Sequence, residues 1–504
     1  MPARAAAPAL LALTLCLPVA AQERPREEDL FGAPPAEAPA AEKPGSPPEN
    51  QAPPAARRPG EAEVLGGQGA DAAESRVAGR LKETENPLQI GGQLYLRLNA
   101  FAREDQPPSQ WGMNSPNVLD LFLDARPSER LRGYTLVRAF YDPTQTQGTN
   151  PLVPVGVAFV GKTTEVALDQ LWMRFDVGQR AFVTAGKQHV KWGTGRVWNP
   201  TDFLHTQRRD PLAVFDTRGG TYLARVAVPI GEQRGGLMAA AVLEPLAPQV
   251  QPIYFPSDQP PPPSSAQLGA VGGAARAEVV LGEWEFGADA VAQRGMKPRA
   301  GLDVSGGLWE LDLRGEMAFR TGSDVPALRP GEDVVTIPGY PSWQRYQRQG
   351  LWIQAVGSAD WSTKYSDEDT LTIGAEYFYN QAGYDDISAY PYLFGWGAYV
   401  PFYLGRHYLA LSLLLPKPGS WNDTTITLTG IANLSDRSGV VRLDWSTTFL
   451  TWLRFEWYVQ GHLGQRGGEF RFAIDIPPIP GSLPNGLVLP PPTVDAGVAM
   501  RVAL

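Results

Sequence analysis

The chain is poor in the residues that carry metal and redox chemistry. Its 504 residues include one cysteine and four histidines. Cys16 lies in an N-terminal stretch that we predict to be removed, so the mature chain would have no thiol for a disulfide or a cysteine metal site. The histidines, His189, His205, His407 and His462, lack the paired spacing of a zinc motif. We therefore predict no metal and no other cofactor.

Long apolar runs and clustered positive charge are also scarce. The apolar stretch at residues 5–18 follows Arg4 and ends before small residues at Ala20 and Ala21, the order of a secretory signal peptide cleaved near Ala21. It is shorter than a spanning helix, which needs about 18 apolar residues or more. The net charge is −9, and losing Arg4 with the signal peptide makes it −10. Nucleic acid, which calls for a clustered basic face, is excluded as a partner.

Residues 22–86 contain proline, alanine and charge with almost no large apolar side chain, as in "GAPPAEAPAAEKPGSPPENQAPPAARRPG". Such a segment cannot bury enough surface to offset its ordering entropy. We interpret it as a disordered periplasmic tail, with a marginal short helix at "DAAESRVAGRLKE". A periplasmic export partner is one candidate for binding it.

Beyond residue 86 the hydrophobic pattern has a period of two, which is typical of strands. In "GLWELDLRGEMAFR" the apolar residues from Trp309 to Phe319 alternate with charged ones, and "VVRLDWSTTF", "TWLRFEWYVQGHLG" and "TLTIGAEYFYN" do the same. These strands reach about ten residues, longer than is usual in soluble sheets. Their apolar faces carry aromatic residues near the ends, like the girdles of lipid-facing barrels.

Long and short connections alternate along the chain. Turns such as "VGQR" and "YSDED" alternate with long linkers such as "NQAGYDDISAYPYLFGWGAYVPFYLGR". This alternation predicts an all-β fold, a transmembrane antiparallel β-barrel over residues 87–504 with about 18 strands, or 16 as the second choice. An even count places both barrel termini in the periplasm of a Gram-negative cell envelope. The C-terminal "DAGVAMRVAL" resembles the signal read by the barrel-assembly machinery, with leucine in place of the terminal aromatic residue.

The segment "GKQHVKWGTGRVWNPTDFL" follows the fifth predicted strand and begins the third external loop. Its glycines permit tight turns and its tryptophans can wedge against the inner wall, so we expect it to fold into the lumen as a constriction. Packing on neighbouring external loops is the alternative. The residues assigned to the constriction are Lys191, Trp192, Arg196, Trp198, Asp202, His205, Arg208 and Arg209. On this hypothesis, changing Arg196 or Arg208 to alanine alters ion selectivity.

A strand ending in "GKQ", followed by "WG" and "NPTD", resembles a group of bacterial outer-membrane barrels related to porins and alginate-export channels. The likeness covers mainly the first six strands. It implies a barrel through which a solute or polymer passes, and it specifies no substrate or functional residue.

The inward strand faces carry mixed charge. We assign to the lumen wall Arg97, Asp120, Asp124, Arg138, Glu310, Asp312, Arg314, Glu316, Arg442, Asp444, Arg454 and Glu456. Glu310, Asp312 and Glu316 are one candidate cation ladder opposite a positive third loop. The alternative is that these charges neutralise one another in a structural barrel.

Two catalytic interpretations are weaker. "GVAFVGKT" fits the phosphate-loop pattern, but a strand-like segment follows it where a helix is needed. The chain has no G-x-S-x-G elbow and no H-E-x-x-H helix, so we predict no enzyme. His462 on a polar strand face could serve a barrel lipase only if a serine and an acid met it in space.

The sequence therefore predicts an outer-membrane porin-like channel for small hydrophilic solutes, surrounded by outer-membrane lipid. One alternative is an export or assembly barrel for a polysaccharide, in which "AYPYLFGWGAYVPFY" would stack on sugars. A surface receptor or adhesin is another.

Overall fold

The computed structural model describes residues 87–145, 164–231, 235–246, 268–333, 336–366, 369–478 and 485–504. The predicted signal peptide, the proline-rich tail with its marginal helix, and the phosphate-loop pattern at residues 156–163 lie outside these residues. None of the helices among the described residues has the length and apolar character needed to cross a membrane.

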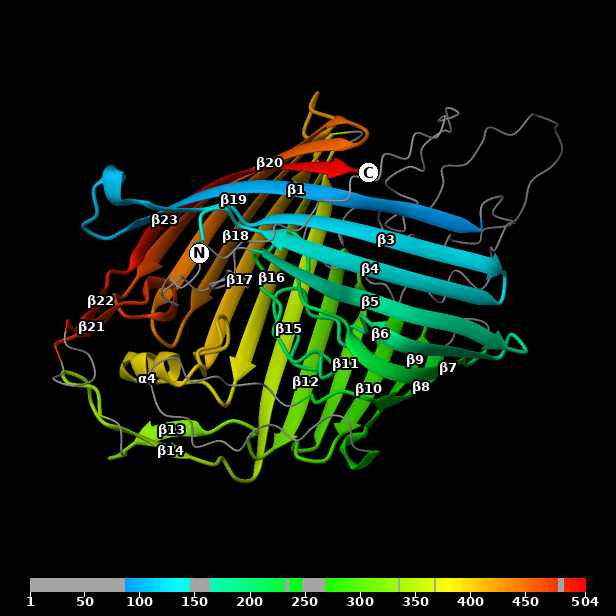
Figure 1. Ribbon diagram of the computed structural model, residues 1–504, viewed down its shortest axis with the longest axis horizontal. Helices are drawn as coiled ribbons and strands as arrows, with labels where there is room; N and C mark the ends of the chain where they lie inside the picture. Colours follow the sequence, from blue (N-terminus) through cyan, green and yellow to red (C-terminus); the bar gives the residue numbers. More distant parts are fainter. Residues whose placement is uncertain are drawn as a thin grey trace, which may run out of the picture. The chain divides into compact units, whose positions relative to one another are not determined.

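The described chain forms a closed antiparallel barrel (Figure 1). Its sheet has 19 strands, of which the three-residue β2 (Gly112–Asn114) only pairs with β1, leaving 18 in the wall. The wall strands are β1 (Leu88–Arg103), β3 (Asn117–Ser128), β4 (Leu131–Tyr141), β5 (Thr164–Val177), β6 (Ala181–Gln188), β7 (Thr221–Pro229), β8 (Gly235–Val242), β9 (Gly272–Leu281), β10 (Trp284–Ala292), β11 (Arg299–Leu308), β12 (Leu311–Thr321), β15 (Leu351–Lys364), β16 (Thr370–Asn380), β17 (His407–Pro416), β18 (Thr424–Asn433), β19 (Ser438–Leu450), β20 (Leu453–Gly464) and β23 (Pro492–Ala503). The prediction of 18 strands is confirmed, and the second choice of 16 is wrong.

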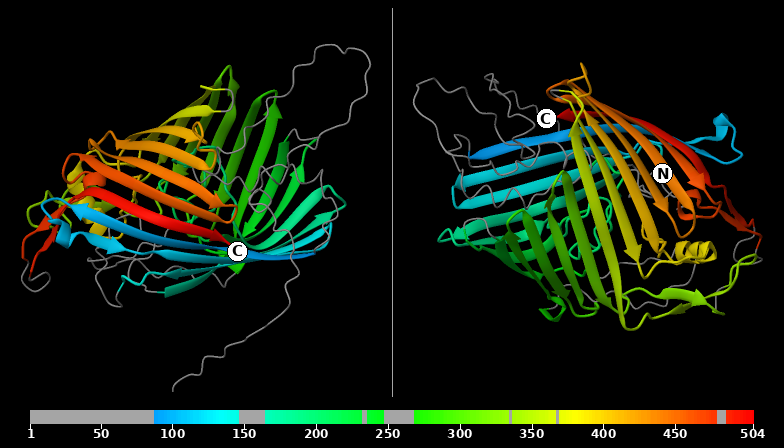
Figure 2. Two further views of the ribbon diagram at one scale, coloured as in Figure 1. Left: turned by 90° about the horizontal axis from the view of Figure 1, so that it is seen from above. Right: turned by 180° about the vertical axis from the view of Figure 1, so that it is seen from behind.

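The ring closes between the first and last strands. Figure 2 shows β23 beside β1, and their register runs from Gln93 opposite Ala503 to Phe101 opposite Asp495. Closure pairs the edge strands that an open sheet would leave free to aggregate. With an even number of antiparallel strands, both ends of the barrel chain lie at the same rim.

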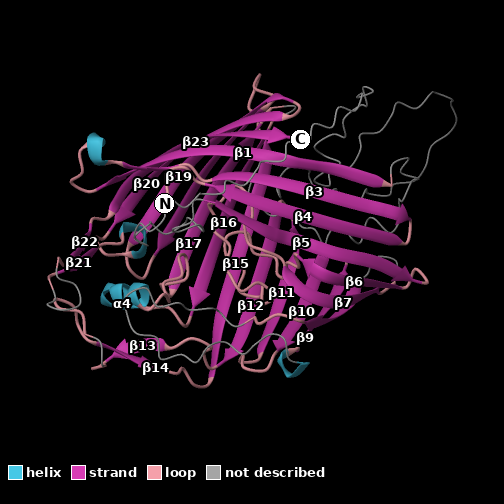
Figure 3. Cartoon of the chain, in the orientation of Figure 1, coloured by secondary structure: helices cyan, strands magenta, loops and turns pink. Residues whose placement is uncertain are grey.

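The two rims differ. At the rim that carries both barrel termini, tight turns such as residues 178–180 and 451–452 join the strands. At the other rim most connections are long, although β10–β11 and β18–β19 are joined by short ones. These long connections contain η1 (Pro108–Gln110), η2 (Leu268–Ala270), β13 (Ala327–Pro330), β14 (Trp343–Tyr346), η3 (Ile387–Ala389), α4 (Tyr390–Gly395), η4 (Glu469–Arg471), β21 (Ile474–Ile476) and β22 (Leu487–Leu489) (Figure 3). The predicted alternation of short and long connections is confirmed.

The outer surface of the wall is apolar. Leu302, Val441 and Phe455 are 52%, 43% and 45% exposed and point away from the lumen, while charged residues of the same strands point inward. Large apolar side chains are this exposed over a whole barrel only where the surrounding medium is itself apolar, as in a bilayer.

One predicted strand is divided by a turn. The segment from Trp309 to Phe319 was expected to be continuous, but Trp309 and Glu310 form the two-residue turn between β11 and β12. The assignment of Glu310 to the lumen wall is therefore wrong, and its carboxylate accepts a hydrogen bond from the Trp361 indole at 3.0 Å. The alternation of β12 extrapolates back through the turn, so the period alone could not reveal the break.

Candidate functional site

The long connection between β6 and β7, residues 189–220, crosses the barrel and is held by carboxylates of distant wall strands. We call it the inward loop. Glu316 of β12 accepts hydrogen bonds from the backbone N–H groups of Thr194 and Gly195 and from the Thr201 hydroxyl, the last at 3.0 Å. These bonds join residues more than a hundred positions apart in sequence, so only the closed barrel brings them together.

Glu376 of β16 holds the next turn of the inward loop. It accepts from the N–H groups of Arg196, Val197 and Trp198 at 2.9, 3.0 and 2.7 Å. Successive N–H groups that converge in this way form an anion-binding concavity, and here a wall carboxylate occupies it. The Arg196 guanidinium meets Asp360 of β15 at 3.0 Å, so its charge is matched by the wall.

Glycine is required where the loop meets Glu316. Gly193 has a φ of +82°, and a Cβ there would lie 2.5 Å from the Glu316 carboxylate. A Cβ on Gly195 would lie 2.0 Å from the Trp198 carbonyl oxygen. Both approaches are too short for any other residue, which explains the "WGTG" sequence.

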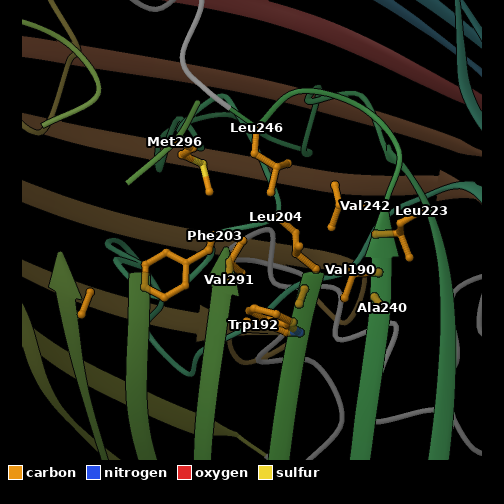
Figure 4. Packing of buried hydrophobic residues seen from close by; sticks show 12 residues of the cluster. Val190, Trp192, Phe203, Leu204, Leu223, Ala240, Val242, Leu246, Val291 and Met296 are labelled. Carbon is orange, nitrogen blue, oxygen red and sulfur yellow. The ribbon is translucent and has the colours of Figure 1, made fainter. Parts of the chain in front are cut away.

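Apolar packing fixes the first half of the inward loop. Trp192, Phe203 and Leu204 are fully or almost fully buried. They lie against the lumen faces of β7 to β12, where the wall side chains include Leu223, Ala240, Val242, Ala274, Val291 and Ala318 (Figure 4). Small wall residues make room for the large loop residues. The alanine-rich segments of β8 and β9 were the sequence signal for this contact.

Trp198 packs on a different group of strands, β16 and β17. Its ring is fully buried, 5.5 Å from that of Phe378 and 5.4 Å from that of Tyr408, and its indole N–H donates to the Phe402 carbonyl at 2.9 Å. The two tryptophans of the motif therefore pack on different groups of strands, Trp192 beside β7–β12 and Trp198 beside β16 and β17.

A polar cluster joins residues 202–205 of the inward loop to residues 216–218. Asp202 lies 2.9 Å from His205 Nδ1 and 2.8 Å from the Arg218 guanidinium, which also meets Asp216. Burial alone would raise the pKa of Asp202, but the charges of His205 and Arg218 outweigh it and lower that pKa. The ring of His189 is 5.6 Å from that of His205. The described residues contain no group of three or more His, Cys, Asp or Glu placed to hold a metal.

Above the inward loop, toward the rim with long connections, lies a cavity of about 890 Å³. We call it the vestibule. Its lining contains five acidic residues, Asp210, Asp216, Asp324, Glu469 and Asp495. It contains ten basic residues, Arg97, Arg103, Arg208, Arg209, Arg218, Lys297, Arg299, Arg320, Arg348 and Arg442.

Several vestibule arginines are bonded to neutral groups. Arg103, Arg320 and Arg348 donate to the backbone carbonyls of Pro490, Pro200 and Ala382. The guanidinium of Arg97 donates to the Asn99 side chain at 2.7 Å and lies over the Tyr458 ring. Carbonyl and ring contacts orient these cations without cancelling their charge, so the vestibule carries an excess of positive charge.

All the residues assigned to the lumen wall except Glu310 lie on inward strand faces, and most form ion pairs there. Asp120 binds Arg138 through both oxygens at 2.7 and 2.9 Å. Asp124 meets Arg126 and Arg132 at 2.8 and 2.9 Å.

The pairing continues on the other strands. Arg442 meets Asp444 at 2.6 Å, and Glu456 meets Arg501 and Arg454 at 2.8 and 3.9 Å. Arg314 is paired with Asp360. Of the proposed cation ladder, Glu310 lies in a turn and Glu316 accepts hydrogen bonds from the inward loop. Asp312 is the remaining member, and it lies on the inward face of β12.

Residues assigned to the constriction are all part of the inward loop, but they do not share one environment. Arg208 and Arg209 line the vestibule, whereas Arg196 pairs with Asp360 and does not line it. Lys191 is not among the residues that line the vestibule, and the remaining members pack or pair as described above. The role of the loop as the narrowest part of the lumen stays a prediction.

Two other segments have structural contacts. His462 bonds Asp495 at 2.8 Å and the Phe470 carbonyl at 2.7 Å, so both ring nitrogens are engaged in holding the β20–β23 connection. The aromatic residues Tyr390, Tyr392, Phe394 and Trp396 around α4 are buried in one core at the loop rim. Phe394 also lines the vestibule, as do Tyr399, Phe402 and Tyr403 of the same segment, so the role of this segment as a platform for sugars stays a prediction.

Known proteins give little further guidance. No protein-family model and no curated protein matches the chain. Among solved structures, Acinetobacter baumannii OccAB4 is similar with a TM-score of 0.49 and 6% identity, covering 83% of this chain and 98% of that one. Pseudomonas aeruginosa OccK8 (OprE) has a TM-score of 0.48 and 7% identity over 83% and 98%. Pseudomonas putida OprB has a TM-score of 0.43 and 10% identity over 83% and 94%. Likenesses this low carry no argument about the function of this chain.

Proposed function

We propose that the chain is an outer-membrane channel for small hydrophilic solutes and that it favours anions among them. The observation that carries this proposal is the vestibule of about 890 Å³, where ten Lys or Arg residues face five Asp or Glu. A lumen with this excess attracts anions and repels cations before either reaches the inward loop.

Membrane insertion is supported by the apolar outer face of a closed barrel, which leaves no backbone edge unpaired in lipid. Secretion through the predicted signal peptide and insertion by the barrel-assembly machinery agree with it. On this proposal the rim with tight turns and both barrel termini faces the periplasm.

The inward loop is the proposed constriction. It is supported by contacts with β12, β15 and β16, which lie across the barrel from β6 and β7. The wall charges that pair with one another then contribute little to selection, and the vestibule cations dominate.

The test is the reversal potential of the purified chain in a planar bilayer with asymmetric potassium chloride. We expect the sign of an anion-preferring pore. We also expect liposomes containing the protein to admit a small organic acid faster than a neutral sugar of equal size. A cation-selective reversal potential would contradict the proposal, and so would the absence of any conductance.

A further inference from the structure

A second, much smaller cavity lies between two segments of the inward loop, residues 191–202 and residues 208–218. It is lined by Lys191, Arg196, Arg208, Arg209 and Arg218, with Asp202 as its one acidic residue. The remaining lining groups are Gly195, Val197, Asn199 and Tyr403. Five cations thus surround a space of about 10 Å³.

Not every one of the five cations has a carboxylate at ion-pair distance, although Glu316 and Glu376 accept the backbone N–H groups of Gly195 and Val197 beside them. Arg196 is paired with Asp360, and Arg218 is shared between Asp202 and Asp216. Arg208 donates to the Asn199 carbonyl at 3.2 Å and lies over the Tyr403 ring, 5.0 Å from its centre. Among the described residues neither Lys191 nor Arg208 has a carboxylate within ion-pair distance.

A cation without a partner carboxylate is unfavourable where water reaches it only in part, and Lys191 is such a partly buried cation. Burial lowers its pKa, and the nearby Arg209 charge lowers it further, against the opposing effect of Glu316 and Asp202. Either the ammonium gives up its proton, or something negative shares the cavity.

We propose that this cavity binds one small monovalent anion, chloride in the cell, held by Lys191 and by the guanidinium groups of Arg208 and Arg209. The anion would supply a negative charge beside Lys191 and Arg208. It would add to the side-chain bonds that already join the two parts of the loop, from Arg208 to the Asn199 carbonyl and from Arg209 to the Arg196 carbonyl.

The size of the space selects the class of ligand. A space of about 10–15 Å³ on this measure holds a single water-sized particle. Phosphate, sulfate and a solute carboxylate are too large, whereas a halide needs only a small adjustment of the flexible Lys191 and Arg208 side chains. Arg208, Arg209 and Arg218 line both cavities, whereas Lys191 lines this one and not the vestibule. Binding at this site can be measured without any solute passing through the vestibule.

Anomalous diffraction from crystals of the full chain grown or soaked in sodium bromide tests the proposal directly. We expect an anomalous peak in the cavity, with Lys191 Nζ and the two guanidinium groups as its neighbours. No peak at saturating bromide would overturn the proposal.

Thermal unfolding in detergent shows whether binding occurs at ordinary concentrations. Sodium chloride is exchanged for sodium gluconate, whose anion is too large for the cavity, at constant ionic strength. We expect Tm to rise with chloride in the natural chain and this dependence to be lost in Lys191→Met and in Arg208→Gln. Lys297→Met, which removes a vestibule lysine outside this cavity, is the matched control and should keep the dependence. A bromide peak without any chloride effect on Tm would mean binding at crystal concentration only, which also overturns the proposal. If one variant fails to fold, the other variant and the natural chain still give the answer.

Discussion

Replacing Glu376 by glutamine should release the inward loop from the wall. The carboxylate accepts three backbone N–H groups at 2.7–3.0 Å and is 4% exposed, so all three bonds are made away from bulk water. Glutamine keeps one acceptor oxygen and turns an N–H₂ group toward donors that it cannot satisfy. A hydrogen bond to a charged group contributes about 1.5–3 kcal/mol, so the loss of one bond with part of a second costs about 2–4 kcal/mol. That changes the equilibrium between docked and released loop by roughly 30- to 900-fold.

Trypsin provides the assay for this release, because Arg208 and Arg209 lie in the loop and are accessible to a protease only after it leaves the lumen. We expect folded Glu376→Gln barrels to be cut there, and the natural barrels to resist under the same conditions. Single-channel records should show larger or noisier currents. The control is Glu278→Gln, because Glu278 of β9 bonds Arg276 of its own strand. If Glu376→Gln resists trypsin and conducts like the natural chain, the inferred anchoring is wrong.

Three further outcomes follow from the contacts. Trp198→Ala removes a fully buried ring packed on two aromatic neighbours, should cost about 3–5 kcal/mol of loop docking and should make the barrel as sensitive to trypsin as Glu376→Gln. Arg97→Gln together with Arg103→Gln should move the reversal potential toward that of a non-selective pore without changing barrel stability, and an unchanged potential would refute the vestibule as the selective region. Burial raises the pKa of Glu469 to about 8, with the nearby Asp436 adding to the shift. An acid whose folded pKa is raised binds more protons when folded, so its contribution to docking of the β20–β23 connection falls as pH rises from about 4.5 to about 8. The protection factors of the amides at residues 468–472, which are corrected for base-catalysed intrinsic exchange, should therefore fall over this range, and Glu469→Gln should remove that change.

Period-two alternation and the spacing of turns were enough to predict the closed barrel. In β20, for example, Phe455 and Val459 face outward and Arg454 and Glu456 face inward, as the alternation required. Strand alternation is a local property, because successive side chains leave a strand on opposite faces whatever lies beyond them. The same locality explains the error at Glu310, since a two-residue turn is too short to interrupt the pattern visibly.

The partners of the inward loop could not be predicted in this way. The sequence contains the tryptophans and glycines that let the segment turn inward, but Glu316 and Glu376 read only as two inward-facing carboxylates among many. Their role as acceptors for the backbone of residues 194–201 depends on the curvature and closure of the wall, which set distances across the lumen between residues far apart in the chain. For the same reason, the count of charged residues suggested a balanced lumen, whereas the tertiary structure pairs many wall charges with one another and leaves cations in excess in the vestibule. Composition is independent of position, while an electrostatic field depends on which charges are neighbours.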